Sequence, residues 1–471
     1  MTSPHVLILA AGKGTRMKSA VPRVLHPVAG RPIIEYVLAT AAALKPCTTT
    51  LVVGHQAETV KAALAVHAGL GFILQEPQLG TGHAVLQAAP VLEGATGTLL
   101  LLYGDVPLLT ADTLGALVAR HEERRAAATV VTAFVDDPTG YGRIVREDGE
   151  LARIVEHRDA TPEERTIREI NSGIYAFDLA PLFDALRRIG SANAQGEYYL
   201  TDLVELYRRE GRGLASLVVS DLHEILGINS RSELAAMSRR VWAARNERLM
   251  AAGVTIEDPA TTYVDEGVEV GPDTVIRPGV VLEGQTRVGS GCTLHIGVRI
   301  VDSTLADRVT VLDHCLITGA RIAEGASIGP FARLRPETEV AQEALIGNFV
   351  ELKKTRFGVG SKASHLTYLG DATVGDGVNV GAGTITCNYD GVRKNPTVIE
   401  DGAFIGSDSQ LIAPVRVGRN AYVAAGSSIT DDVPPESLAI ARGRQVVKEG
   451  WAARKKKQQA ASSQQSADAK K

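Results

Sequence analysis

The amino-acid sequence predicts two domains of different class: an α/β domain with a doubly wound, Rossmann-like sheet, and an all-β parallel β-helix. Three observations support this prediction. Strand and helix patterns alternate in the N-terminal half, an aliphatic residue returns at every sixth position in the C-terminal half, and one helical pattern separates the two. The length of 471 residues agrees, because a chain of this size rarely folds around a single core.

Short apolar runs that predict buried strands alternate with helical patterns in the N-terminal half. The apolar runs are His5–Ala10, Thr50–Val53, Thr98–Leu102 and Thr129–Phe134, and the helical patterns are Pro32–Ala43, Glu58–His67 and Thr113–Arg125. This alternation predicts a mostly parallel sheet, in which ligands bind beyond the C-terminal ends of the strands. Both a Gly-rich turn after Ala10 and the segment Tyr103–Asp105 lie at such ends.

The hexapeptide array predicts a β-helix in which three hexads form one triangular coil and the aliphatic residue points inward. The period itself does not give the handedness of the coil. After one interruption the array resumes, and it resumes again after residue 352. Its members are Val264, Val270, Ile276, Leu282, Val288, Leu294, Ile300, Ile322, Ile328, Leu334, Val340, Ile346, Leu352, Val374, Val380, Ile399, Ile405, Leu411, Val417, Val423 and Ile429.

Changes of pattern predict the domain boundaries. Ser230 and Glu233 fit a capping box, apolar residues follow at helical spacing, and Gly253 is a stop signal. We therefore predict an N-terminal domain over 1–229, a linker helix over 230–252 and a β-helix over 253–450. Residues 451–471 are rich in Lys, Gln, Ser and Ala, and we predict a disordered, solvated tail there.

Composition excludes several classes of protein. The net charge of −4 gives no general attraction to nucleic acid or to anionic membranes. Cys47, Cys292, Cys315 and Cys387 are scattered without a C-x-x-C pair, which supports neither a zinc site nor a disulfide framework and favours a reducing, cytoplasmic location. The apolar N-terminus reads as a first strand and not as a signal peptide, and no apolar run reaches membrane-spanning length.

The turn after the first strand has the composition of a phosphate-binding loop. Gly12 and Gly14 allow the backbone to approach a phosphate, and Lys13 and Arg16 add positive charge. The pattern is neither a P-loop nor a dinucleotide fingerprint, because the Gly-Lys-Ser/Thr ending and the third Gly are missing. A tight strand-to-helix turn without any ligand is the alternative for the glycines alone.

The whole string is more specific than its glycines. Leu9–Met17, followed by Pro22 and Arg23, resembles the signature of sugar-1-phosphate nucleotidyltransferases, which has Lys at the position of Arg23. Further stretches resemble the uracil, sugar and metal positions of such enzymes. They are Gln75, Leu79–Ala84, Tyr103–Asp105, Thr139–Ile144, Glu156–His157, Glu169–Gly173 and Gly227–Asn229.

The array in turn resembles the left-handed β-helix of the hexapeptide acyltransferases. Nearly the whole chain except the tail thus resembles the family of bifunctional N-acetylglucosamine-1-phosphate uridylyltransferases and glucosamine-1-phosphate N-acetyltransferases. This resemblance implies acetyl-CoA-dependent acetylation of glucosamine 1-phosphate, followed by transfer of uridylate from UTP to N-acetylglucosamine 1-phosphate. The product, UDP-N-acetylglucosamine, would feed peptidoglycan and lipopolysaccharide precursor synthesis.

The resemblance implies residue roles in the N-terminal domain. Asp105 and Asn229 would hold Mg²⁺ through oxygen, Lys13 and Arg16 would act on the leaving pyrophosphate, and Arg23 would hold the sugar phosphate. No general base is needed, because the attacking phosphate is already an anion. The remaining substrate positions are Leu9, Ala10, Ala11, Gly12, Gln75, Gly80, Thr81, Tyr103, Gly104, Gly142, Glu156 and Asn171.

Polar residues interrupt the hexads in the C-terminal half, and a loop after Thr386 leaves the coil. Acetyl transfer needs a base to deprotonate the substrate amine, and His365 is our candidate, with Glu351 as a possible orienting partner. By resemblance, Arg335, Lys353, Tyr368, Asn379, Asn388 and Tyr389 would hold the sugar phosphate, and Ala382, Ser407, Ala425 and Arg442 would line the acetyl-CoA site.

The resemblance further implies a homotrimer, with active sites between adjacent prisms. Two alternatives remain open at this point. One is a nucleotidyltransferase whose β-helix is only an assembly scaffold, and the other is a non-catalytic sensor of sugar nucleotides. The first conflicts with the cluster of Lys353, His365, Tyr368 and Asn388, and the second with the complete set of Gly12–Arg16, Asp105 and Asn229.

Overall fold

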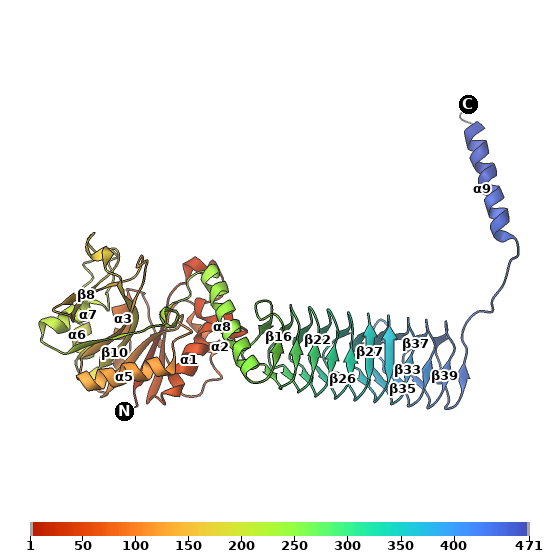
Figure 1. The fold of residues 1–471 in the computed structure, drawn as a ribbon, viewed down its shortest axis with the longest axis horizontal. Coiled ribbons are helices and arrows are strands. Elements are labelled where there is room, and N and C mark those ends of the chain that lie inside the picture. The colour runs from red at the N-terminus through yellow and green to blue at the C-terminus, as the bar shows by residue number, and fades with distance from the viewer. Residues whose placement is uncertain (1–2, 469–471) are drawn as a thin grey trace. The chain divides into compact units, whose positions relative to one another are not determined.

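The computed structural model describes residues 3–468, which fall into two compact units (Figure 1). The first unit runs to residue 248 and includes residues 263–267, and the second comprises residues 249–262 and the chain from 268 onward. The first unit is α/β and the second is built from short parallel strands. None of the helices in the described chain combines the length and apolar character of a membrane span.

The first unit contains a twisted sheet with strand order β11-β7-β10-β6-β1-β4-β5. All neighbours on this path are parallel except β10, which is antiparallel to both β6 and β7. The strands are β1 (His5–Ala10), β4 (Thr48–Val53), β5 (Leu70–Leu74), β6 (Thr98–Tyr103), β7 (Ala128–Phe134), β10 (Glu169–Asp178) and β11 (Leu214–Val218). A hairpin of β8 (Arg143–Glu147) and β9 (Glu150–Val155) pairs with β10, and β2 (Pro27–Val28) pairs with β3 (Arg31–Pro32).

Two hydrophobic cores lie on opposite faces of this sheet. Because side chains alternate along a strand, Val6 and Ile8 of β1 enter one core while Leu7 and Leu9 enter the other. The first core includes α1 (Ile33–Ala43), α2 (Ala57–Ala63) and α5 (Ala111–Arg124). The second includes α3 (Thr81–Leu86), α4 (Ala89–Leu92), α6 (Leu179–Leu186) and α7 (Asp202–Arg209). The predicted doubly wound arrangement is therefore observed.

The predicted linker helix is α8 (Arg231–Ala251). Its first turn has the reciprocal bonds of a capping box: Ser230 Oγ accepts from the Glu233 backbone N–H, and Glu233 Oε2 accepts from that of Ser230. Glu233 Oε2 also accepts from the Asn229 backbone N–H at 2.6 Å. The cap therefore fixes the backbone at one of the two predicted metal ligands.

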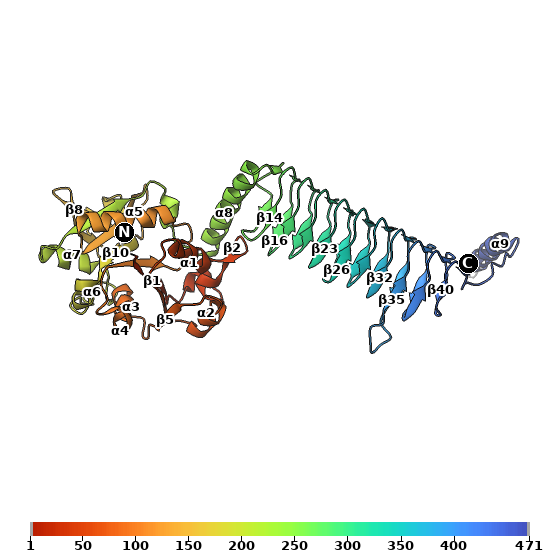
Figure 2. The same cartoon turned by 90° about the horizontal axis from the view of Figure 1, so that it is seen from below.

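The second unit is a prism with three parallel sheets, each adding one strand per coil (Figures 1 and 2). The first sheet, called sheet C, comprises β12 (Thr255–Ile256), β15 (Val275–Ile276), β18 (Thr293–Leu294), β21 (Thr310–Val311), β24 (Ser327–Ile328), β27 (Leu345–Asn348), β30 (Lys362–His365), β33 (Asn379–Val380), β36 (Phe404–Ile405), β39 (Tyr422–Val423) and β41 (Leu438–Ala439).

The second sheet, called sheet D, contains β16 (Val281–Glu283), β19 (Arg299–Val301), β22 (Leu316–Thr318), β25 (Arg333–Leu334), β28 (Glu351–Lys353), β31 (Tyr368–Gly370), β34 (Ile385–Cys387), β37 (Gln410–Ile412) and β40 (Ser428–Ile429). The third contains β14 (Glu269–Val270), β17 (Arg287–Val288), β20 (Thr304–Leu305), β23 (Ala320–Ile322), β26 (Thr338–Val340), β29 (Arg356–Phe357), β32 (Ala372–Val374), β35 (Thr397–Ile399) and β38 (Val415–Val417). β13 (Tyr263–Val264) falls in the residues that cluster with the first unit.

The first interruption in the hexad series is a shortened corner and not a break in the coil, whereas the gap before Ile399 contains an inserted loop. Val270 pairs with Val288, whereas Val288 pairs with Leu305, a step that is one residue shorter. Leu305, Val311 and Ile317 then fill the first interruption, and all are buried. Of the predicted inward residues, only Val270 keeps appreciable exposure. A search at exact six-residue spacing misses these positions. When one corner residue is absent, the next inward residue comes five positions later, although the strands still stack in the same way.

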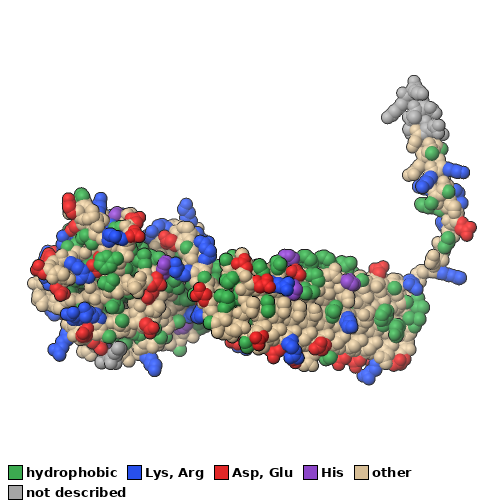
Figure 3. Space-filling view, viewed as in Figure 1, with side chains coloured by type: hydrophobic (Ala, Val, Ile, Leu, Met, Phe, Trp, Pro, Cys, Tyr) green, Lys and Arg blue, Asp and Glu red, His purple; other side chains and the backbone are tan. Residues whose placement is uncertain are grey.

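The tail differs from its prediction. Trp451–Asp468 forms helix α9, and its residues up to 463 are exposed (Figures 1 and 3). The prediction of disorder relied on the polar composition, but Ala, Lys, Gln and Arg are also strong helix formers. Residues 469–471 lie outside the described chain.

The four thiols should differ strongly in reactivity. Cys292 and Cys315 are buried inside the prism, where burial raises the pKa of both thiols, that of Cys315 to about 11. Because the thiolate is the reactive form, an aromatic disulfide reagent at pH 8 should label exposed Cys47 first and half-buried Cys387 more slowly. The other two thiols should react only after unfolding. Rapid labelling of more than two thiols in the native protein would contradict this expectation.

Two candidate active sites

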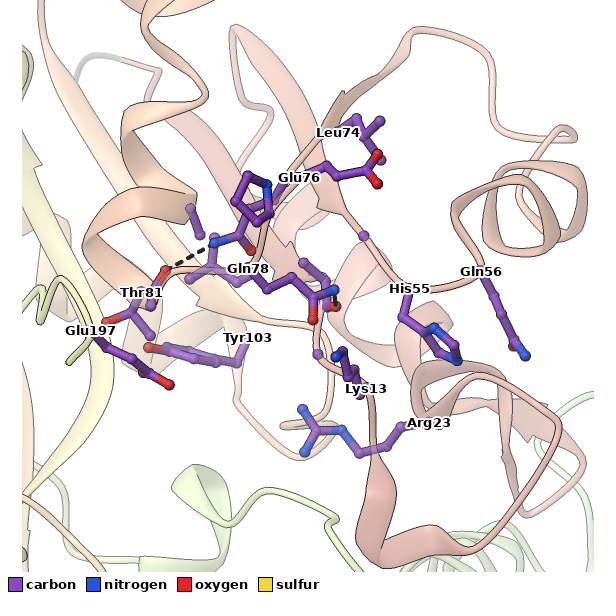
Figure 4. Close-up of a pocket in the computed structure, with 18 residues that line it drawn as sticks. Lys13, Arg23, His55, Gln56, Leu74, Glu76, Gln78, Thr81, Tyr103 and Glu197 are labelled. Carbon is purple, nitrogen blue, oxygen red and sulfur yellow. Dashed lines mark hydrogen bonds between the residues drawn. The ribbon is translucent and has the colours of Figure 1, made fainter. Parts of the chain in front are cut away.

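A cavity of about 890 Å³ opens at the C-terminal edge of the sheet in the first unit (Figure 4). Its lining comes from the ends of neighbouring strands: Leu9, Ala11 and Gly12 after β1, Gly54 after β4, Gln75 after β5 and Tyr103 at the end of β6. Lys13 and Arg23 also line it and are seen together in Figure 4. A cavity therefore lies at the sheet edge where the sequence predicts a ligand site.

The predicted metal ligands lie together beside this cavity. The Ile228 backbone N–H donates to the Asp105 carbonyl oxygen at 2.9 Å, which places Asn229 next to Asp105. Arg23 Nη2 lies 2.7 Å from Asp105 Oδ2, and Arg23 Nη1 donates to Asn229 Oδ1 at 2.7 Å. Arg16 Nη2 donates to the same Asn229 oxygen at 2.7 Å. Burial raises the pKa of the Asp105 carboxyl, and the guanidinium of Arg23 opposes this shift.

The residues predicted for uracil lie on the other side of the cavity. Gln75 is buried and donates from Nε2 to the Gly80 carbonyl oxygen at 3.0 Å. Gly80 has φ +108°, and a Cβ there would come within 2.7 Å of the Tyr198 carbonyl oxygen, so the chain requires glycine at this point. Thr81 Oγ1 accepts from the Leu200 backbone N–H at 3.2 Å. The segment after β5 is thereby held against residues 198–200.

The residues predicted for the sugar are fixed by contacts within the first unit. Asn171 Oδ1 accepts from the Tyr175 hydroxyl at 3.0 Å, and the Asn171 backbone N–H donates to the Gly142 carbonyl oxygen at 2.9 Å. Glu156 accepts from Thr201 Oγ1 at 3.2 Å, and burial raises the pKa of this carboxyl. Tyr103 lies against Gly173, where a Cβ would come within 2.8 Å of the phenol ring.

The cavity also contains residues that the sequence reasoning did not select. Gln78 donates from Nε2 to the Ala11 carbonyl oxygen at 2.5 Å, and so ties the loop after β5 to the Gly-rich turn. His55, Gln56 and Glu197 line the cavity as well. His55 and Gln56 follow the end of β4, and this position after a predicted strand is the one sequence feature that could have indicated that they line the cavity.

In the second unit, the predicted orienting partner of His365 is wrong. His365 Nδ1 lies 2.5 Å from Asn348 Oδ1, whereas Glu351 Oε1 accepts from Arg335 Nη1 at 3.0 Å. An amide oxygen only accepts, so Nδ1 carries a proton, and Nε2 is the accepting nitrogen of the neutral ring. The pairing follows from the register, because Asn348 of β27 lies directly opposite His365 of β30. The spacing of residues in the sequence does not show which residue of the preceding coil lies opposite His365.

Of the predicted sugar-phosphate residues, Lys353, Tyr368 and Asn388 form a cationic and polar cluster on and beside sheet D. Lys353 pairs in register with Gly370, and a Cβ at Gly370 would meet both the Tyr368 hydroxyl and Asn388 Nδ2. Asn388 Nδ2 donates to Asp371 Oδ2 at 2.6 Å, and Lys353 Nζ lies 3.8 Å from the same oxygen. These side chains therefore share one patch of the prism.

A further cation joins this cluster from a loop. Residues 388–396 leave the coil between β34 and β35 (Figure 2), and Tyr389 and Lys394 form a β-bridge within the loop. The neighbouring Lys353 ammonium lowers the pKa of Lys394. Lys394 therefore adds a second positive charge beside Lys353. Sequence reasoning selected Asn388 and Tyr389 from this loop but missed Lys394, because a lone lysine in a loop carries no pattern.

The predicted acetyl-CoA residues lie in one column along an edge of sheet C. Ala363, Val380, Ile405 and Val423 pair in succession, and His365, Ala382, Ser407 and Ala425 each follow two positions later. Successive coils of a parallel sheet lie about 4.8 Å apart. Arg442 Nη1 donates to the Ala425 carbonyl oxygen at 2.7 Å at the far end of the column. The imidazole and the predicted acetyl-CoA positions are therefore aligned on one edge.

One chain does not bring every predicted acetyltransferase residue together. Asn379 lies on sheet C, whereas the Lys353 cluster lies on sheet D. Within residues 3–468, no hydrogen bond or ion pair joins His365 or Asn379 to Lys353, Tyr368 or Asn388. The two faces of one prism point in different directions.

Comparison with known proteins identifies each part of this architecture. The MobA-like NTP transferase domain matches residues 6–170, the GMPPB C-terminal domain matches 259–357, and the bacterial transferase hexapeptide (six repeats) matches 396–431. The bifunctional protein GlmU of Trichlorobacter lovleyi is 53% identical over 97% of this chain and 99% of its own length. The chain belongs to the GlmU family.

Other members agree over a similar length. The bifunctional protein GlmU of Syntrophotalea carbinolica is 54% identical over 95% of this chain and 96% of its own, and that of Brevibacillus brevis is 50% identical over 96% and 98%. The GlmU match confirms the predicted bifunctional enzyme, a uridylyltransferase and acetyltransferase of UDP-N-acetylglucosamine synthesis. It also confirms the predicted fold class, including the left-handed β-helix. Sugar phosphate, nucleotide and acyl-CoA substrates and a divalent metal agree with this family.

Proposed function

We propose that the first unit transfers uridylate from UTP to N-acetylglucosamine 1-phosphate at the cavity beside Asp105. The observation that supports this most directly is the buried Asp105 carboxylate, with Arg23 and Arg16 close to it, beside an open cavity lined by Lys13. Cationic side chains around a cavity with a carboxylate at its side suit a polyphosphate with a divalent metal ion. Lys13 and Arg16 neutralise the leaving pyrophosphate, while Gln75, Gly80 and Thr81 position the base.

The residues around Asp105 fit Mg²⁺. No group of three His, Cys, Asp or Glu side chains suited to a metal occurs in the described part of the chain. Asp105 and Asn229 nevertheless offer two hard oxygens that already face one cation. Mg²⁺ typically binds one or two protein oxygens and completes its shell with water and substrate phosphate. When bound, it would neutralise charge on the phosphates. Asp105 and Asn229 hold the metal, and Gly142, Glu156 and Asn171 orient the sugar.

We propose further that His365 is the general base for acetylation of glucosamine 1-phosphate by acetyl-CoA. With Nδ1 bonded to Asn348, the free Nε2 accepts a proton from the bound ammonium group. The amine then attacks the thioester carbonyl, and CoA leaves as the thiol. Ala382, Ser407, Ala425 and Arg442 line the path of acetyl-CoA, whose acetyl end lies at the His365 end of the column.

The cluster on sheet D supplies the sugar-phosphate site. Arg335, Lys353 and Lys394 provide positive charge, while Tyr368, Asn388 and Tyr389 provide hydrogen-bonding groups. A non-catalytic scaffold has no need for such a set. Release of free thiol from acetyl-CoA with glucosamine 1-phosphate, and of pyrophosphate from UTP with N-acetylglucosamine 1-phosphate, tests the two halves separately. Absence of either release in the folded protein would refute the assignment of that half.

A homotrimer would complete the acetyltransferase site, because Asn379 and Lys353 lie on different sheets of one prism. In a closed trimer, a site between prisms would combine Asn379 of one chain with Lys353 of the next. Mixing the inactive variants Asn379→Ala and Lys353→Ala in subunit exchange should then restore about one quarter of the acetyltransferase activity, because each mixed trimer contains one intact site. Light scattering should show three subunits. A mixture that stays inactive after verified exchange would place both residues in one chain.

A further inference from the structure

We propose that Arg23 fills the metal position of the first unit until a metal ion arrives, so that metal binding requires the Arg23 guanidinium to leave. This inference rests on the proposed uridylyl transfer and adds a regulated step to it. The two oxygens available for a metal, Asp105 Oδ2 and Asn229 Oδ1, are each 2.7 Å from a different Nη atom of Arg23. One planar group therefore spans both ligands.

The guanidinium and a divalent ion exclude one another at this place. A metal bound to both oxygens would occupy the space in front of them, which the fork of Arg23 now fills. The Asp105 side chain is only 9% exposed, so little water screens two neighbouring cations there. Arg16 Nη2 donates to the same Asn229 oxygen at 2.7 Å, but only Arg23 forms an ion pair with Asp105, so Arg23 is the cation that spans both ligands.

The surrounding residues hold Arg23 in this position. A buried carboxylate needs a counter-ion, and Arg23 supplies it in the absence of metal. The backbone at Asp105 is tied to Ile228, and the stem of Arg23 passes against Gly14, where a Cβ would come within 2.9 Å of the Arg23 Cβ. Arg23 also lines the cavity, so the released guanidinium has a phosphate-binding space beside it.

Arginine is better suited to this role than lysine. Its planar fork directs two N–H groups at two acceptors at once, whereas an ammonium is a compact point charge. Arg23 therefore has a second use besides charge for the sugar phosphate: it determines how tightly Asp105 and Asn229 can bind a divalent ion. We expect the substrate-free protein to bind divalent ions weakly. Variants in which the Arg23 guanidinium is replaced by an ammonium or by a neutral group should bind them more tightly.

Binding of Mn²⁺ to the full-length protein without nucleotide tests this inference. Electron paramagnetic resonance of free Mn²⁺ should show that Arg23→Gln lowers the dissociation constant about ten-fold or more, and that Arg23→Lys gives an intermediate value. Arg153→Gln removes an arginine from an ion pair with Glu164 elsewhere in the unit and should leave the constant unchanged. Asp105→Asn should abolish this binding in either background. Equal or weaker Mn²⁺ binding by Arg23→Gln would overturn the proposal.

Thermal unfolding gives a second readout that does not depend on turnover. Arg23→Gln leaves the Asp105 carboxylate without its counter-ion, so its Tm in EDTA should fall below that of the parent. Mn²⁺ should then raise the Tm of the variant by more than it raises that of the parent. Equal shifts would contradict the proposal even if the variant were unstable without metal. Pyrophosphate release by the parent enzyme tests uridylyl transfer separately, so the two failures are distinguishable.

Discussion

Asp105→Ala is expected to lower uridylyl transfer by at least about 100-fold, because the variant lacks the carboxylate proposed to hold the metal on the phosphates. Acetyl transfer should stay close to the parent rate, because His365 and the Lys353 cluster lie in the second unit. Both rates can be measured on one preparation, by pyrophosphate release and by thiol release. The ratio of the two activities is therefore the decisive quantity.

Two further variants guard against a trivial loss of activity. Asp105→Asn keeps the size of the side chain and should lose uridylyl transfer to a similar degree. Asp112→Ala removes an exposed carboxylate from the first turn of α5 and should keep both activities. If Asp105→Ala lost acetyl transfer as well while remaining folded, the two sites would not act independently. Unchanged uridylyl transfer in both Asp105 variants would rule this residue out as a metal ligand.

His365→Ala is expected to lower kcat for acetyl transfer by about 10²–10⁴-fold, the usual cost of removing a general base. The KM for acetyl-CoA should change little, because the imidazole acts on the amine. Uridylylation of supplied N-acetylglucosamine 1-phosphate should continue at the parent rate.

Two comparisons make this test specific. His314→Ala removes an exposed histidine from another corner of the prism and should leave acetyl transfer unchanged. Asn348→Ala removes the acceptor of the Nδ1 proton, so it should lower kcat to a smaller degree than His365→Ala does. A folded His365→Ala enzyme with near-parent kcat for acetyl transfer would show that another group accepts the proton.

Local sequence patterns determined the architecture. The apolar content of a six-residue run indicates a buried strand, and the position within a hexad indicates which residue points inward. Both signals can be read from the sequence because they depend on only a few neighbouring residues. The Gly-rich turn after β1 and the segment after β6 were placed at one sheet edge by the same reasoning, since parallel strands bring their C-terminal ends together. Even the interrupted hexads indicated the right fold, although a shortened corner concealed Leu305, Val311 and Ile317.

Contacts between distant residues were decided by the tertiary structure alone. The partner of His365 is Asn348 and not Glu351, because strand register across coils and not sequence distance selects the facing side chain. Lys394 reaches Lys353 through a loop whose course no pattern predicts. The resemblance named Arg23, Asp105 and Asn229 separately, whereas the folded chain joins them through one guanidinium. The periodicity of the sequence indicates which face of an element a residue occupies. The packing of the folded chain determines which other residue it contacts.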